Sequence, residues 1–234
     1  MKKKVIFAIT PARGNSKGIK NKNLKSIKKK SLLKLCFDVA KKTKLIDEIV
    51  ISSDSNKIIK KAKSIGYKIY FKRPKYLSGD RVSDMSVLKH ALIEIEKKIE
   101  KKIDYIVMLQ ITSPLRKSKY IRECIKKILN ERLDSVWTVS KVDKKYHPDK
   151  QLTIINNKIK FFSKNGKKII ARQQLKNTFI RNGAVYVFSR KAILKGKILP
   201  KNSSYVIIKD EMISIDTKQD LKRVETIIGS SKVK

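Results

Sequence analysis

Apolar and polar positions follow two alternating patterns along the chain. Short, mostly apolar runs are typical of strands buried on both faces, and between them lie longer stretches with apolar residues at helical spacing. The predicted strands are Val5–Thr10, Glu48–Ser53, Tyr67–Lys72, Asp104–Gln110, Ser135–Val142, Tyr205–Lys209 and Met212–Ile215. The predicted helices are Ser31–Lys42, Asn56–Ile65, Met85–Lys97, Lys119–Asn130 and Leu221–Ile228. Repeated strand, loop and helix favour an α/β fold with a mainly parallel sheet flanked by helices.

The pattern changes between residues 143 and 178, where the chain becomes more polar. Around Asn156-Asn157 the sequence LTIINNKIKFF alternates as a β-hairpin does. We interpret this segment as an inserted excursion, and residues 1–142 and 179–234 as one main domain, to which the chain returns in a strand that begins near Arg181. The length of 234 residues suits such an arrangement.

The loop after the first strand is rich in cations, which are Arg13, Lys17, Lys20 and Lys22. Gly14 and Gly18 let its backbone turn tightly and approach a ligand closely. Cations and exposed amides at the carboxyl end of a strand suit a nucleoside triphosphate. The loop matches neither G-x-x-x-x-G-K-[ST] nor G-x-G-x-x-G. Because lysine is frequent throughout the chain, a solvated surface loop is the alternative.

Polar residues also stand at later strand boundaries. Gln110 ends a predicted strand, where its amide offers a donor and an acceptor to a ligand, and Thr112-Ser113-Pro114 then predicts a turn. Asn182-Gly183 by itself predicts only a turn before a strand. Asp216 follows the last predicted strand and faces the ligand side, so it is a candidate binding residue.

The net charge of +39 raises the alternative of a nucleic-acid-binding protein. Ten of the 59 basic residues are arginine, and the 49 lysines spread over nearly every predicted helix and loop. RNA-binding signatures, zinc fingers and basic-zipper heptads are absent from the sequence. Nucleic acid is therefore not expected as a functional partner. A polyanion-binding protein on an inactive enzyme fold is kept as the alternative.

The cysteines and the hydropathy of the chain bear on metal binding and on location in the cell. Cys36 and Cys124 lie in helical apolar patterns and are predicted to be core residues, since two cysteines cannot form a metal cluster. His147 is interpreted as a loop residue rather than a catalytic base. The sequence has no run of about eighteen apolar residues and no signal-peptide pattern, so we expect a cytoplasmic protein without a membrane partner.

Five blocks of sequence, in order, resemble the CMP-sialic acid synthetases (acylneuraminate cytidylyltransferases) and their legionaminic and pseudaminic acid relatives. The blocks are Ala12 to Asn23, Arg73 to Ser83, Leu109 to Arg116, Arg172 to Tyr186 and Asp216 to Asp220. The resemblance implies a Rossmann-like nucleotidyltransferase fold. It also implies a reaction in which CMP passes from CTP to the anomeric hydroxyl of a nine-carbon α-keto sugar acid, with release of pyrophosphate.

The same resemblance implies roles for individual residues. The nucleotide would be bound by Ala12, Arg13, Gly14, Ser16, Lys17, Lys22, Asn23, Arg73 and Ser83. The sugar acid would be bound by Gln110, Thr112, Ser113, Arg172, Gln173 and Asn182. Arg172 suits the carboxylate of the acid, because its guanidinium can donate two parallel hydrogen bonds.

Catalysis would rest on Arg13, Lys22 and Asp216, with Asp216 as the ligand of Mg²⁺. The family commonly has two acidic residues two positions apart here, and Ser214 replaces the first of them in this chain. Mg²⁺ often takes only one or two protein carboxylates and completes its shell with phosphate oxygens and water. The resemblance further implies a homodimer whose contact is made by the excursion.

Overall fold

A six-stranded sheet forms the centre of the protein, with the strand order β10-β6-β9-β5-β1-β4. This computed structural model describes residues 3–15 and 18–230. The strands are β1 Ile6–Pro11, β4 Glu48–Ser52, β5 Tyr105–Met108, β6 Ser135–Lys141, β9 Phe179–Ser189 and β10 Ser203–Ile207. β1 is parallel to β4 and β5, and β10 to β6, whereas β9 is antiparallel to both of its neighbours. The prediction of a mainly parallel sheet is confirmed.

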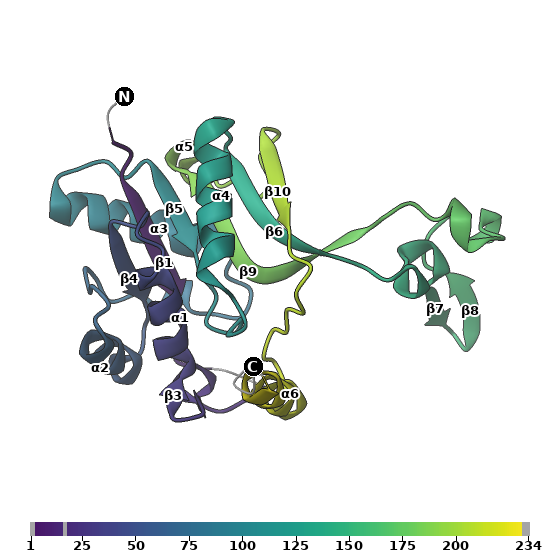
Figure 1. Ribbon diagram of the computed structural model, residues 1–234, viewed down its shortest axis with the longest axis horizontal. Coiled ribbons are helices and arrows are strands. Elements are labelled where there is room, and N and C mark those ends of the chain that lie inside the picture. The colour runs from purple at the N-terminus through teal and green to yellow at the C-terminus, as the bar shows by residue number, and fades with distance from the viewer. Residues whose placement is uncertain (1–2, 16–17, 231–234) are drawn as a thin grey trace.

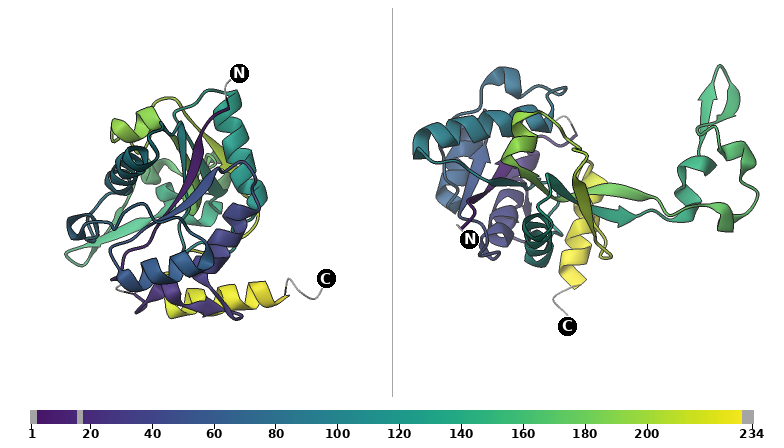
Figure 2. Two further views of the ribbon diagram at one scale, coloured as in Figure 1. Left: turned by 90° about the vertical axis from the view of Figure 1, so that its left-hand side faces the viewer. Right: turned by 90° about the horizontal axis from the view of Figure 1, so that it is seen from above.

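Helices cover both faces of this sheet (Figures 1 and 2). They are α1 Leu32–Lys41, α2 Asn56–Ile65, α3 Asp84–Ile99, α4 Ser118–Asn130, α5 Arg190–Leu194 and α6 Lys218–Ser230. Serine side chains start four of them by accepting a backbone amide hydrogen bond, which satisfies a donor that the first turn leaves free. These caps are Ser31, Ser55, Ser83 and Ser189.

The strand β1 is buried because its side chains alternate between two cores. Phe7 and Ile9 pack against α3 on one face, and Ile6 and Ala8 pack against α1 and α4 on the other. Cys36 and Cys124 lie in the second of these cores as free, buried thiols, as predicted. Two helical layers therefore fix the position of β1, and the loop that follows it starts from a rigid strand.

The segment 143–178, called the arm below, leaves the body between β6 and β9 and extends away from it (Figures 1 and 2). It holds the antiparallel hairpin of β7 Leu152–Ile155 and β8 Lys158–Phe161. Asn156 and Asn157 join the strands with φ values of 52° and 58°, which is the conformation of a tight hairpin turn. The hairpin predicted from the alternating sequence is confirmed. A second small hairpin, β2 Ser26–Ile27 with β3 Lys30–Ser31, follows the first loop.

The predicted strand Tyr67–Lys72 is wrong, because only Lys68 forms a bridge, to Val50 of β4. Beyond Lys68 the contacts with β4 come from single groups instead of a ladder. The hydroxyl of Tyr70 donates to the Glu48 carboxylate at 2.6 Å, and the amide of Arg73 donates to the Ser53 carbonyl at 2.8 Å. This chain path carries Arg73 over the carboxyl end of the sheet.

The predicted strand Met212–Ile215 is wrong as well. This stretch is extended but has no strand beside it, and the amide of Ile215 donates to the carbonyl of Thr112 in the turn after β5 at 2.8 Å. The strand predicted at Tyr205–Lys209 exists two residues earlier, as β10. The chain thus leaves the sheet after β10 and crosses the ends of its strands before α6. No helix among the described residues has the length and apolar character to cross a membrane.

Candidate active site

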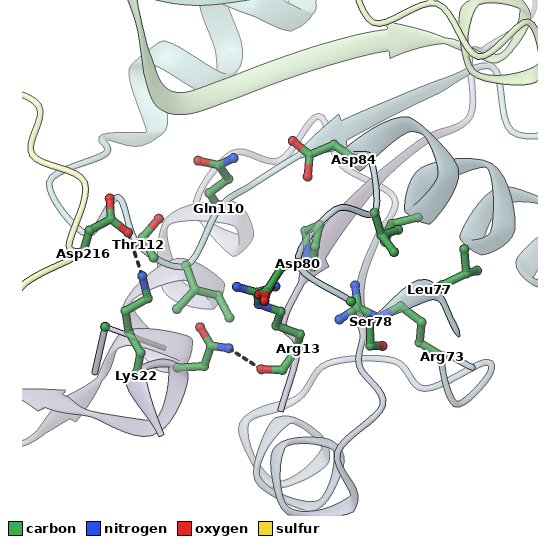
Figure 3. A pocket seen from close by; sticks show the side chains of 17 residues that line it. Arg13, Lys22, Arg73, Leu77, Ser78, Asp80, Asp84, Gln110, Thr112 and Asp216 are labelled. Atoms are coloured by element: carbon green, nitrogen blue, oxygen red, sulfur yellow. Dashed lines mark hydrogen bonds and ion pairs between the residues drawn. The ribbon is translucent and has the colours of Figure 1, made fainter. Parts of the chain in front are cut away.

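A cavity of about 490 Å³ opens at the carboxyl ends of β1 and β5, where ligands of open α/β sheets bind (Figure 3). Its wall comes from the loop after β1, the segment before α3, the turn after β5 and the segment before α6. Its polar and charged lining residues are Arg13, Lys22, Asn23, Arg73, Ser78, Asp80, Asp84, Gln110, Thr112 and Asp216. Residues predicted separately from four distant blocks of sequence therefore meet here.

The loop after β1 is folded by contacts that its own residues make. The amide of Gly14 donates to the Asp54 carboxylate at 2.8 Å, and the side-chain amide of Asn23 donates to the Arg13 carbonyl at 3.0 Å. A Cβ atom on Gly18 would lie 2.4 Å from the carbonyl oxygen of Asp216, so only glycine fits there. Ser16 and Lys17, both predicted to bind the nucleotide, lie outside the described residues.

Two of the cavity's cations face carboxylates across it (Figure 3). Arg13 lies 2.6 Å from Asp80, and Lys22 lies 2.8 Å from Asp216. Both carboxylates are open to solvent, with side-chain exposures of 43% and 69%. Phosphate oxygens can replace such partners, because they accept the same charge-assisted hydrogen bonds.

Arg73 is a buried cation with spare donors. Its side chain is 4% exposed, its nearest carboxylate is Asp54 at 3.8 Å, and Nε and one terminal nitrogen have no hydrogen-bond partner among the described residues. Burial lowers the pKa of Arg73, with Asp54 opposing this effect. A buried donor without a partner costs free energy, so these nitrogens are suited to a ligand in the cavity.

Gln110 lies against the start of β9, and this contact depends on Gly183. Gly183 has a φ of +70°, and a Cβ atom there would lie 2.7 Å from Oε1 of Gln110. Ser113 donates to the carbonyl of Gly183 at 2.9 Å. Asn182 accepts from Thr138 at 2.7 Å and donates to Ser140 at 3.1 Å. Gln110 therefore faces the cavity, whereas Ser113 and Asn182 join neighbouring strands beneath it.

Several residues predicted for the site are not part of the cavity wall. Ala12 is buried under the loop, and Ser83 caps α3 by accepting the amide of Ser86 at 3.1 Å. Arg172 and Gln173 are on the arm, away from the cavity (Figure 1), in the single turn Arg172–Gln174. Arg172 is exposed there and lies 3.9 Å from Asp143.

Three further carboxylates lie near the site: Asp80 belongs to the predicted block Arg73 to Ser83, whereas Asp54 and Asp84 were not among the residues predicted to bind. Asp54 follows β4 and fixes the first loop, and its place at the carboxyl end of a parallel strand was the signal for it. Asp80 faces Arg13. Asp84, at the start of α3, points into the cavity (Figure 3). The loss of water around Asp84 raises its pKa, and Arg181 and Arg73 oppose that rise.

Asp216 is held by the start of α6. The amides of Asp216 and Thr217 donate to the Asp220 carboxylate at 3.0 and 2.7 Å, and the Thr217 hydroxyl accepts from the amide of Asp220 at 3.1 Å. Thr217 and Asp220 thus form a capping box at the start of α6. Ser214, on the same segment, donates to the Thr112 hydroxyl at 3.3 Å. No cluster of three metal-binding side chains occurs among the described residues. One exposed carboxylate still suits Mg²⁺ when phosphate oxygens complete its shell.

The fold and the cation-lined cavity define a nucleotidyltransferase. A model of the cytidylyltransferase family matches residues 7–226. The chain is 30% identical to CMP-N,N'-diacetyllegionaminic acid synthase of Campylobacter jejuni, over 93% of this chain and 92% of that protein. It is 29% identical to pseudaminic acid cytidylyltransferase of the same species, over 92% and 93%. The chain belongs to the cytidylyltransferase family.

The fold is shared with a solved CMP:2-keto-3-deoxy-manno-octonic acid synthetase complexed with CTP. The two structures agree with a TM-score of 0.72 over 97% of this chain and 99% of that one, at 13% identity. The predicted nucleotidyltransferase fold is confirmed. The polyanion-binding alternative receives no support from these comparisons.

Proposed function

We propose that the protein transfers CMP from CTP to the anomeric hydroxyl of a nine-carbon α-keto sugar acid of the sialic acid type, with release of pyrophosphate. The observation that carries this proposal is the meeting of Arg13, Lys22 and Asp216 at one cavity, although Asp216 is 194 residues from Lys22. The names of the relatives described above, which act on legionaminic and pseudaminic acids, support the choice of acid.

The nucleotide would lie between the first loop and Arg73. Arg13 and Lys22 exchange their carboxylate partners for triphosphate oxygens, and Lys17 adds a third cation from the same loop. The nitrogens of Arg73 that have no hydrogen-bond partner among the described residues would bind the nucleotide on the other side of the cavity. Asn23 contributes by holding the Arg13 backbone in place.

In the reaction the anomeric oxygen attacks the α-phosphorus and forms the new P–O bond, while the bond to the bridging oxygen of the β-phosphate breaks. The hydroxyl proton passes to solvent, and pyrophosphate leaves with the bridging oxygen. The protein aligns the two reactants and neutralises the charge that builds up on the triphosphate. Gln110 and Thr112, at the end of β5, lie where the sugar acid would approach.

Asp216 would hold Mg²⁺, which neutralises triphosphate charge when bound. Lys22 lies 2.8 Å from the same carboxylate, so with Mg²⁺ held by Asp216 this cation would be available to the phosphates. Thr112 and Ser214 place hydroxyl groups beside Asp216 where a second acidic residue is common in relatives. A single-carboxylate site follows from this arrangement.

The arm would make a homodimer. It exposes Ile154 at 75%, Ile159 at 69% and Ile170 at 93%, a set of apolar side chains that a second subunit would cover. Arg172 shares the arm with them, and the arm extends away from the body that holds the cavity (Figure 1). In the dimer, Arg172 would therefore bind the sugar carboxylate in the cavity of the partner.

The test is pyrophosphate release by the purified protein with Mg²⁺, each of the four nucleoside triphosphates and a panel of nine-carbon α-keto acids. Release with CTP and at least one acid is expected, and release with the other triphosphates should be far slower. If every combination stays at the background rate, the proposed function is wrong. A mock preparation, purified in the same way from cells that do not express the protein, gives the background rate from contaminating activities.

A further inference from the structure

The turn after β4 is bonded to two separate walls of the cavity. The Ser53 carbonyl accepts the amide of Arg73 at 2.8 Å, which holds the segment before α3. The Asp54 carboxylate accepts the amide of Gly14 at 2.8 Å, which holds the loop after β1. The first of these bonds joins backbone atoms, whereas the second uses a side chain. Asp54 is therefore the point at which a substitution can alter this connection.

The peptide group between Arg13 and Gly14 is held at both of its polar atoms. Its N–H donates to Asp54 at 2.8 Å, and its carbonyl oxygen accepts from the side-chain amide of Asn23 at 3.0 Å (Figure 3). A Cβ atom on Gly14 would lie 3.0 Å from Cβ of Ser55, so the loop lies directly against the turn after β4. Because a peptide group is planar, the two bonds fix the orientation of the backbone from which the Arg13 side chain starts.

The same carboxylate is the counter-charge of Arg73. Its Oδ1 atom, which accepts the Gly14 amide, lies 3.8 Å from a terminal nitrogen of Arg73. Burial lowers the pKa of Arg73, Asp54 opposes this effect, and the positive charge of Arg13 adds to it. A buried cation that loses its carboxylate is strongly destabilised. Asp54 therefore compensates the charge of the second arginine at the cavity.

We infer that Asp54 is a positioning residue for the nucleotide, whose one carboxylate fixes Arg13 through the Gly14 amide and Arg73 through its charge. Among the described residues, both arginines line the cavity and Asp54 does not, so Asp54 acts through them (Figure 3). The two effects need different properties of the side chain, because the Gly14 amide needs only an acceptor oxygen, whereas Arg73 needs a negative charge. The inference rests on the proposed function, since it assigns a role at the CTP site.

The experiment measures pyrophosphate release at increasing CTP concentration for the wild-type protein, Asp54→Ala and Asp54→Asn. Asp54→Ala should lower kcat/KM for CTP roughly 10- to 100-fold, the range for losing a hydrogen bond to a charged group. The KM for the sugar acid should stay at the wild-type value. Asp54→Asn should lie between the two proteins, because its side-chain oxygen can still accept the Gly14 amide.

Combined variants separate the two effects. Arg13→Ala should cost at least about fivefold less in Asp54→Ala than in the wild type, because there the arginine has already lost its position. In Asp54→Asn, Arg13→Ala should cost as much as in the wild type. Arg73→Gln should cost less than in the wild type in both Asp54 variants, since neither carries the charge that Arg73 faces.

The matched control is Asp47→Ala, at the opposite end of the sheet. Asp47 also joins a backbone amide to a cation, because it accepts from Ile6 at 2.8 Å and lies 2.8 Å from Lys3. Its side-chain exposure of 28% is close to the 22% of Asp54. Asp47→Ala should lose stability in urea unfolding as Asp54→Ala does, but it should keep the wild-type kcat/KM for CTP.

Different results would contradict different proposals. If the wild-type protein releases no pyrophosphate with CTP and any acid, the proposed function is wrong and the role of Asp54 falls with it. If the wild type is active and Asp54→Ala matches Asp47→Ala in its kinetics, the positioning role is wrong and the proposed function stands. If Asp54→Ala does not fold, the Asp54→Asn variant decides, and a cost of Arg73→Gln equal to that in the wild type would contradict the role.

Discussion

The ammonium group of Lys22 lies 2.8 Å from the carboxylate of Asp216. One residue belongs to the loop after the first strand of the sheet and the other to the segment that follows its last strand. Their contact joins the two ends of the fold at the proposed site of phosphoryl transfer. A metal held by Asp216, as proposed, would compete with Lys22 for this carboxylate.

Asp216→Asn should reduce kcat by roughly 10²- to 10³-fold, the range for losing one preorganised electrostatic group. Asparagine keeps the size of the side chain and its partner Lys22, but loses the charge that holds Mg²⁺. The matched control is Glu211→Gln on the same segment, where Glu211 forms an ion pair with Arg223 outside the cavity. Steady-state kinetics at several Mg²⁺ concentrations gives kcat for both variants. Turnover of Asp216→Asn at the wild-type rate would contradict the metal assignment.

Arg13→Ala should cost roughly 2–4 kcal/mol of transition-state stabilisation, measured as the loss in kcat/KM for CTP. Arg13→Lys should recover only part of it, because lysine lacks the planar pair of donors. Arg81→Ala removes a cation next to Asp80 that does not line the cavity, and serves as the control. Equal losses in Arg13→Ala and Arg81→Ala would mean that net charge, rather than position, accounts for the effect.

Gly183→Ala and Gly196→Ala form a pair that separates backbone strain from damage to the site. The φ values are +70° and +65°, so both variants should lose about 1–2 kcal/mol of stability. A methyl group at Gly183 would displace the Gln110 side chain, whereas nothing lies within 4 Å of the same position at Gly196. Only Gly183→Ala should raise the KM for the sugar acid. Urea unfolding measures the stability of each variant, and pyrophosphate release at increasing sugar-acid concentration measures its KM. Equal KM values for the two variants would refute the placement of Gln110.

Glu96 gives a stability prediction that depends on pH. It accepts hydrogen bonds from Arg190 at 2.8 and 2.9 Å and from the Ile103 amide at 2.8 Å. Burial raises the pKa of Glu96, but these hydrogen bonds outweigh burial, so the pKa lies below the ordinary 4.5. The stabilisation is therefore present above about pH 4.5 and is lost as the pH falls through the lower pKa of the folded state.

Glu96→Gln should accordingly lower the free energy of unfolding by about 1–2 kcal/mol at pH 7. The difference from wild type should shrink as urea titrations move below about pH 4. Glu94→Gln, which affects only an outer pair with Lys97 at 3.4 Å, is the control. A difference between Glu96→Gln and wild type that stays constant with pH would show that packing, not charge, causes the loss.

The proposed exchange of Arg172 between subunits can be tested by mixing two inactive variants. In the proposed dimer, the Arg172→Ala variant lacks the arginine at both sites, and the Asp216→Ala variant lacks the carboxylate at both sites. After mixing and exchange of subunits, heterodimers should regain activity, because one of their cavities receives an intact Arg172 and contains an intact Asp216. If the mixture stays as inactive as its components while co-purification through different affinity tags on the two variants shows heterodimers, Arg172 serves its own cavity or none.

Local sequence signals predicted most of the scaffold and the first half of the site. The predicted helices near Ser31, Asn56 and Met85 start at serines that bond to amides three residues away. Arg13, Lys22 and Asn23 follow one buried strand. Short stretches of sequence therefore contain the information for these features. The failed strands had the right local pattern. At Tyr70 and Ile215 the competing hydrogen bonds come from distant residues, and only the folded chain reveals them.

The rest of the site depends on contacts between residues far apart in the sequence, which a local pattern cannot predict. Asp54 and Gly14 are 40 residues apart, so their hydrogen bond could not be read from either segment alone. Asn182 and Ser113 have residue types that suit a ligand site, but their polar atoms already join strands.

All six strands of the main sheet precede Asp216 in the sequence. The sheet itself therefore contains no residue of the segment that carries the proposed metal ligand. Because a Cβ atom at position 18 would lie 2.4 Å from the carbonyl oxygen of Asp216, this segment fits over the first loop only where that loop has a glycine. The last part of the chain thus adds its chemistry to an architecture that the preceding residues define.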